Sequence, residues 1–366
     1  MQVVDKNNHL NFFRLLFALQ VLYMHSTEWL KIPLIWGGYV DKFIQLFPGV
    51  PLFFLVSGFL ITDSYLSSKN LKEYFIKRGF RIYPALFVNI LVLEIFMWIG
   101  GNLNDVSILK YIGYFILYVI TASNGIAGSI FGLKSDMIYN YGGFFSNYPS
   151  GVLWTLSVEL SFYLVLPFIL GIRKTNVRFL IMFCLFCVSL VIPAIADDKF
   201  YQSSNLNKLL ELIFLPFIWI FIVGIAIRLY WSNLKEHLIK NSLYYFMFYL
   251  LFCYCAINFG GGLGNYKKGL EILTIIQIIL LAFAMFGLAF SFTNFKVIRK
   301  TDLSYSTYLY HMLVVQILIS LGYSGDKILY FVVIGSTFMI AYFSWTFIEE
   351  PILNLKKLRV KKCYKQ

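Results

Sequence analysis

The chain has 366 residues, of which 59% are hydrophobic, 19% aromatic and only 13% charged. Soluble domains carry roughly a quarter of charged residues, so this composition excludes an ordinary soluble protein. The net charge of +13 is better explained by basic cytoplasmic loops of a membrane protein than by affinity for nucleic acid, which is not an expected partner.

Apolar runs long enough to cross about 30 Å of hydrocarbon recur along the chain and predict ten spans. An eleventh apolar stretch, 108–122, is too short to cross alone and is expected to be re-entrant or interfacial. The predicted fold is therefore an all-α membrane protein, a polytopic bundle of about ten transmembrane helices plus this segment. The spans are predicted near 11–30, 47–66, 80–100, 151–171, 177–195, 209–230, 243–259, 270–292, 303–322 and 328–349.

The distribution of basic residues predicts the orientation. If the N-terminus is cytoplasmic, 22 of the 31 Lys and Arg residues fall on inner segments and 9 on outer ones, as the positive-inside rule requires. We therefore expect a multi-pass protein of the inner (cytoplasmic) cell membrane with both termini in the cytoplasm. One membrane domain is predicted over 1–350 and a basic cytoplasmic tail over 351–366. Arg14 interrupts the first apolar run and no small-residue cleavage site follows it, so a removed signal peptide is not expected.

The first predicted span carries three ionisable residues, Arg14, His25 and Glu28. Charges at membrane depth are costly and mark functional sites by default. Arg14 and His25 are eleven residues apart, which places them on nearly the same helix face about 16 Å apart along the axis. Glu28 follows His25 by three residues and is positioned to orient its imidazole. The alternative is that Arg14 reaches to the cytoplasmic interface while His25 and Glu28 lie in the outer headgroup layer.

Arg78 and Arg81 share one helix face where the third span leaves the cytoplasm. Two guanidinium groups at this spacing suit a phosphorylated cytosolic ligand, because each can fork onto a phosphate. The alternative is an ordinary basic anchor at the membrane interface.

Other spans carry further polar residues, and a charged one among them must face protein or water instead of lipid. Each also has a plain structural explanation as a hydrogen-bonded packing residue. Pro351 is expected to end the last helix. Cys184 and Cys187 have CxxC spacing, but no His or acid accompanies them, so packing residues are predicted and no metal is expected. The polar residues singled out among them are Ser57, Glu159, His311 and Glu349.

Taken in order, these residues resemble six motifs of the acyltransferase 3 family, integral membrane O-acyltransferases that modify surface carbohydrates. The resemblance spans nearly the whole chain. Glu350 departs from it, because the family usually has Arg or Lys there, and the family's common fused extracytoplasmic hydrolase-like domain is not expected. The motifs are Arg14 with His25, Gly49-Val50-Pro51 through Ser57-Gly58-Phe59, Arg78 with Arg81 before Tyr-Pro, Trp154 to Glu159, Tyr-Leu-Tyr-His311, and Glu349-Glu350-Pro351.

The resemblance implies transfer of an acyl group, expected to be acetyl, from cytoplasmic acyl-CoA to a hydroxyl of a cell-surface or lipid-linked polysaccharide. His25 is the candidate general base or nucleophile, and the sequence does not choose between these. Arg14 would contact the donor, and Arg78 with Arg81 would hold its phosphates. Proteins of polysaccharide assembly are candidate partners.

Two other functional classes stay open from the sequence. A transporter or flippase of a lipid-linked sugar would also need buried charge and broken helices, but it would not consume acyl-CoA. A non-catalytic scaffold for a polysaccharide synthase would tolerate His25→Ala. The acceptor sugar, the acyl chain and the oligomeric state are not determined by the sequence.

Overall fold

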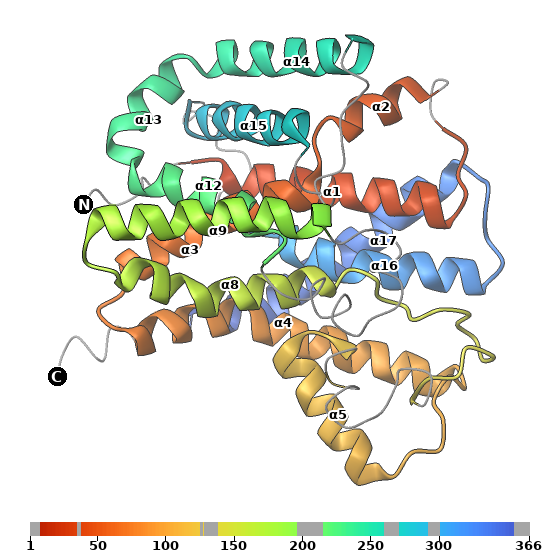
Figure 1. Cartoon of the computed structure of the whole chain (residues 1–366). Coiled ribbons are helices and arrows are strands. Elements are labelled where there is room, and N and C mark those ends of the chain that lie inside the picture. The colour runs from red at the N-terminus through yellow and green to blue at the C-terminus, as the bar shows by residue number, and fades with distance from the viewer. Residues whose placement is uncertain are drawn as a thin grey trace. The chain divides into compact units, whose positions relative to one another are not determined.

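The computed structural model describes residues 8–34, 38–124, 127, 138–195, 215–259, 271–291 and 301–354. These residues form helices and no strand, apart from one isolated bridge between Leu103 and Tyr139. The prediction of an all-α protein is confirmed. The helices (Figure 1) are α1 Leu10–Trp29, α2 Tyr39–Gln45, α3 Gly49–Leu66, α4 Leu71–Ile99, α5 Ile108–Thr121, α8 Trp154–Gly171, α9 Thr175–Ile195, α12 Ile218–Leu229, α13 Trp231–Lys240, α14 Ser242–Phe259, α15 Ile272–Ser291, α16 Ser304–Ser320 and α17 Ile328–Ser344.

Many of these helices are long and apolar enough to span a bilayer. Among the described residues seven qualify, or eight if α12 and α13, which meet at 94°, form one broken span. The other two predicted spans coincide with α1 and α16. The structure thus confirms a polytopic helical membrane protein, and the count of ten stays a prediction.

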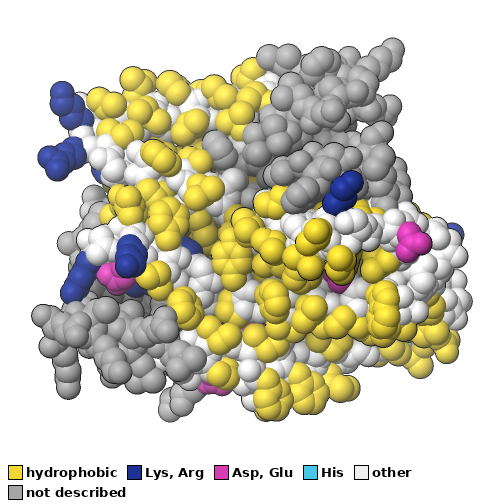
Figure 2. All heavy atoms as spheres, turned by 90° about the horizontal axis from the view of Figure 1, so that it is seen from below, with side chains coloured by type: hydrophobic (Ala, Val, Ile, Leu, Met, Phe, Trp, Pro, Cys, Tyr) yellow, Lys and Arg dark blue, Asp and Glu magenta, His cyan; other side chains and the backbone are white. Residues whose placement is uncertain are grey.

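Large apolar side chains are exposed on the outside of the helices. Phe168, Phe259 and Phe331 are 78%, 82% and 76% exposed, and Figure 2 shows hydrophobic side chains spread over the visible face. Apolar surface on this scale marks contact with lipid or another apolar partner. Helices suit a lipid environment because they satisfy their backbone hydrogen bonds internally. The chain is therefore an integral membrane protein.

Helix α5 is the short apolar segment expected near 108–122. Its 14 residues span about 21 Å, less than the roughly 30 Å of a hydrocarbon core. Ala122 follows it with a left-handed φ of 53°, a conformation that commonly ends helices. The length agrees with a segment that does not cross the membrane by itself.

One helix begins before its predicted span, and the expected helix end at Pro351 was wrong. The helix of the third predicted span begins at Leu71, because the Asn70 side chain accepts from the backbone N–H of Glu73 at 2.9 Å and caps the helix there. The last helix passes through Pro351 to Asn354. A π-helical turn, Trp345–Glu349, precedes this proline and already interrupts the regular hydrogen-bond ladder, so the missing N–H is tolerated.

The chain forms two compact units. The first comprises Met1–Phe17, Phe43–Tyr74 and Val158–Thr301, and the second comprises Ala18–Lys42, Phe75–Ser157 and Asp302–Gln366. The single membrane domain over 1–350 stays a prediction. Residues 355–366 of the predicted tail lie outside the described residues.

In the first unit, α3 packs closely against α12 through two glycines. A Cβ added at Gly224 would lie 2.1 Å from the carbonyl oxygen of Leu55, and one at Gly58 would lie 2.3 Å from that of Phe221. Small residues let helix backbones approach in this way where lipid supplies no hydrophobic drive for association. Arg228 on α12 also pairs with Asp63 of α3 at 2.7 Å.

In the second unit, the C-terminal half of α1 packs against α16 and α17. Leu22, Val315 and Val333 belong to one buried apolar cluster. Tyr23 stacks on Tyr330 with ring centroids 4.9 Å apart. This packing fixes the part of α1 that carries His25.

The second unit also contains a buried carboxylate, Glu94 on α4, that the sequence analysis did not single out. Its oxygens accept from the hydroxyls of Tyr111 on α5 and Tyr139, each at 2.6 Å. Burial raises the pKa of Tyr139 well above the usual value for a phenol, so its hydroxyl remains a donor. The cluster therefore ties α5 and the segment around residue 139 to α4.

Candidate active site

Two histidines from distant parts of the sequence meet in the second unit. Nδ1 of His25 on α1 lies 2.9 Å from Nε2 of His311 on α16. The ring centroids are 5.2 Å apart and the angle between the ring planes is 15°. His311 is completely buried, whereas His25 is partly exposed. A buried imidazole thus supports one that other molecules can approach.

The far side of His311 contacts the backbone of its own helix. Its Nδ1 lies 2.8 Å from the carbonyl oxygen of Tyr308 and 3.3 Å from that of Thr307. The hydroxyl of Tyr308 in turn lies 2.8 Å from Oγ1 of Thr155, and Asn89 donates to the carbonyl oxygen of Leu309 at 3.3 Å. These contacts hold α16, and with it the His311 ring, in a defined position.

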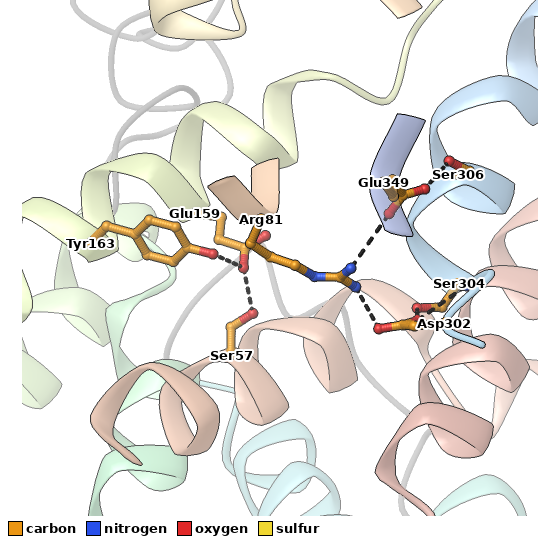
Figure 3. A network of polar contacts seen from close by, with 8 residues as sticks. All are labelled: Ser57, Arg81, Glu159, Tyr163, Asp302, Ser304, Ser306 and Glu349. Carbon is orange, nitrogen blue, oxygen red and sulfur yellow. Dashed lines mark hydrogen bonds and ion pairs between the residues drawn. The ribbon is translucent and has the colours of Figure 1, made fainter. Parts of the chain in front are cut away.

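A second network in the same unit is centred on Arg81 (Figure 3). Its guanidinium donates to Asp302 and, at 3.4 Å, to Glu349. Glu349 is only 3% exposed and also accepts from the Ser306 hydroxyl at 2.6 Å. The guanidinium carbon lies 5.6 Å from the ring centroid of Tyr305, a cation–π contact. The network joins α4, the start of α16 and the π-helical turn.

Both predicted arginines lie on α4 one turn apart, and both are partly exposed. Arg81 is compensated by two carboxylates. Ser306 and His311 lie on the same helix, five residues or about 8 Å apart along its axis. Helix α16 thus carries side chains of both the histidine pair and the Arg81 network.

The first unit contains a third polar group (Figure 3). Glu159 on α8 accepts from the hydroxyl of Ser57 on α3 at 2.8 Å and from that of Tyr163, one turn away, at 2.9 Å. Its carboxylate is half-buried. The hydroxyl donors are what a carboxylate at membrane depth requires.

The other residues predicted for the site lie on α1 and α8. Arg14 is half-buried on α1, Glu28 is exposed one turn beyond His25, and Trp154 is partly exposed at the start of α8. His311, not Glu28, contacts Nδ1 of His25. The orienting role of Glu28 stays a prediction. Within the described ranges, no three His, Cys, Asp or Glu side chains group as a metal site would require.

The contacts join the six sequence motifs in three pairs, of which the sequence showed none. His25 meets His311, Ser57 meets Glu159, and Arg81 meets Glu349. The sequence analysis also missed Asp302. One feature of the sequence could have identified it: Asp302 stands just before a predicted span, where helix-capping residues usually lie. In the structure, its Oδ1 accepts from the backbone N–H of Ser304 at 3.3 Å.

Comparisons with known proteins agree on one family. The family model described as an acyltransferase domain matches residues 7–348. Nodulation protein 10 of Rhizobium leguminosarum bv. viciae is 35% identical over 95% of this chain and 94% of its own length. The O-acetyl transferase of Shigella phage Sf6 is 24% identical over 83% of this chain and 84% of its own.

A Staphylococcus aureus (strain MRSA252) protein provisionally named an O-acetyltransferase is 26% identical over 94% of this chain. The chain spans 57% of the length of that relative. No solved structure gives a significant match.

Proposed function

The chain belongs to the acyltransferase 3 family, and on that premise we propose that it is a membrane O-acyltransferase that acylates a carbohydrate. The acyl group, acetyl by expectation, moves from cytoplasmic acyl-CoA to a hydroxyl of a cell-surface or lipid-linked polysaccharide. The names of the phage and Staphylococcus relatives support O-acetyl transfer. The observation that carries the proposal is the contact between the partly exposed His25 and the buried His311.

His25 is the proposed catalytic residue. An imidazole can take a proton near neutral pH, so it can act as general base on a sugar hydroxyl. The hydroxyl oxygen then forms the ester bond with the acyl carbon, the carbon–sulfur bond of the thioester breaks, and the departing thiolate takes the proton back from His25. A nucleophilic variant, in which His25 first carries the acyl group, uses the same nitrogen and gives the same products.

The phosphates of the donor are assigned to Arg78 and Arg81. A polyanion does not enter the hydrocarbon core, so its nucleotide end would be held at the cytoplasmic surface, where the count of basic residues puts this part of α4. Arg81 also pairs with Asp302 and Glu349, so a bound phosphate would share its guanidinium with these carboxylates. Arg14 is proposed to contact the pantetheine or phosphate portion of the donor.

The proposal places the protein in the inner membrane with both termini in the cytoplasm. It then takes its donor from the cytoplasm and delivers the acyl group to an acceptor at the outer face. Proteins of polysaccharide assembly are the expected partners.

The test is mass spectrometry of surface glycans from cells that carry wild-type protein, His25→Ala or no protein. General base catalysis is typically worth about 10² to 10⁴ in rate, so His25→Ala should lose nearly all of the acyl mass. His237→Ala is the matched control, because His237 is exposed on α13. Turnover above roughly a tenth of the wild-type value in His25→Ala would remove His25 from the mechanism. Glycans that lose sugar units but no acyl mass without the gene would support the transporter instead.

A further inference from the structure

We propose that His311 is a positioning residue that fixes the tautomer of His25, with the proton on Nδ1 and the basic lone pair on Nε2. This inference rests on the proposed role of His25 as a base or nucleophile, and it specifies which of its two nitrogens reacts. It follows from the contacts of the two rings.

The assignment begins at the backbone of α16. The carbonyl oxygens of Tyr308 and Thr307 can only accept hydrogen bonds, so the Nδ1 atom that faces them at 2.8 and 3.3 Å must carry the proton of His311. The ring is completely buried and faces another imidazole, where a positive charge would be costly. His311 is therefore neutral, and its Nε2 has a lone pair and no hydrogen.

The proton position on His25 follows from that lone pair. Nε2 of His311 lies 2.9 Å from Nδ1 of His25. One of the two nitrogens must donate, and since His311 cannot, Nδ1 of His25 does. A neutral imidazole carries a single N–H, so the lone pair of His25 is on Nε2. Two backbone carbonyls thus determine, through one intervening ring, which nitrogen of His25 is basic.

The same contact supports the charged form of His25 during turnover. When Nε2 takes the proton of the acceptor hydroxyl, both nitrogens of His25 carry protons, and Nδ1–H continues to donate to His311. No proton has to pass between the rings. The role matches that of the acid behind the histidine of a catalytic triad, which sets the tautomer and stabilises the imidazolium. A neutral acceptor suits a group at membrane depth, because it adds no buried charge.

The experiment reads the tautomer directly by nitrogen-15 NMR of the full-length protein, labelled at histidine and held in lipid nanodiscs. The chain has only four histidines, His9, His25, His237 and His311, so each signal can be assigned by its loss in a single variant. Nitrogens with and without a proton differ widely in chemical shift. The wild type should show His25 protonated at Nδ1.

Two substitutions of His311 separate its contacts. His311→Gln keeps a terminal amide whose oxygen can accept from Nδ1 of His25, so the tautomer should persist. His311→Asn is too short to reach His25 but keeps a donor for the backbone, so His25 should gain the Nε2–H tautomer. The kcat of the Asn variant should fall by about 10- to 1000-fold, while its KM for the acyl donor stays within about twofold of wild type. The Gln variant should retain at least about ten times more activity than the Asn variant.

Wild-type His25 protonated at Nε2, or a tautomer that does not change in His311→Asn, would overturn the proposal. Equal losses of kcat in the Asn and Gln variants would do the same, because a purely structural role does not distinguish them. Elution of both variants as folded protein in size-exclusion chromatography is the control. If wild-type protein transfers no acyl group, the proposed function fails, whereas the tautomer is still decided by the spectrum.

Discussion

Replacing Arg81 by Met removes the guanidinium that neutralises Asp302 and Glu349. The side chain of Arg81 is 18% exposed and those of its partners are 9% and 3% exposed, so water screens the ion pairs poorly. At the 3.4 Å that separates Arg81 from Glu349, the attraction is about 5 kcal/mol for an effective dielectric constant of about 20. Removal of one partner of a buried ion pair typically costs about 3 to 5 kcal/mol, since the remaining charge stays buried and loses that counterion.

Thermal melting of the full-length protein in detergent, followed by size-exclusion chromatography, measures this cost. At about 2 °C per kcal/mol, Arg81→Met should lower the Tm by about 6 to 10 °C. Glu349→Gln should cost less, about 1 kcal/mol, because its amide oxygen still accepts from Ser306 and Arg81 keeps Asp302. The double variant should lose less than the sum, because the two residues are in direct contact.

The control is Arg173→Met, which changes an exposed arginine after α8 and should leave the Tm within about 2 °C of wild type. If the Tm of Arg81→Met equals that of the Arg173→Met control, the Arg81 network gives no net stabilisation. The role of Arg81 would then be to bind a ligand, and not to stabilise the fold through Asp302 and Glu349.

Three further predictions test the fold, the donor site and the topology. Gly224→Ala should destabilise the protein by about 1 to 3 kcal/mol or more, because its Cβ would overlap a backbone carbonyl; Gly171→Ala, where a Cβ meets nothing within 4 Å, should melt like wild type. Arg78→Lys should weaken CoA binding several-fold in a titration, because an ammonium cannot fork onto a phosphate, and an unchanged Kd would make Arg78 a helix anchor. In a cysteine-free background, single cysteines at Lys69 and Asn124 should label from the cytoplasmic and outer sides respectively; labelling from one side would show that the predicted topology is wrong.

The sequence alone was sufficient for the class of fold and for most helix bounds. The span predicted at 243–259 is observed as Ser242–Phe259, and the one predicted at 270–292 as Ile272–Ser291. This succeeds because a helix in lipid satisfies its backbone within one continuous apolar stretch, so its limits are local in sequence. The sequence also identified most of the polar residues that now form the candidate site, since polar groups in apolar runs are conspicuous.

Only the tertiary structure decided which of these polar residues meet. His25 and His311 are 286 positions apart, and Arg81 and Glu349 are 268 apart. The periodicity of one helix says nothing about which helix it faces. Asp302 and Glu94 were overlooked although the sequence contains a signal for each, a helix-cap position for Asp302 and a charge inside the predicted span 80–100 for Glu94. Their partners were known only from the structure. The tautomer of His25 depends on two carbonyl oxygens of another helix, and such a relation exists only once the helices have packed.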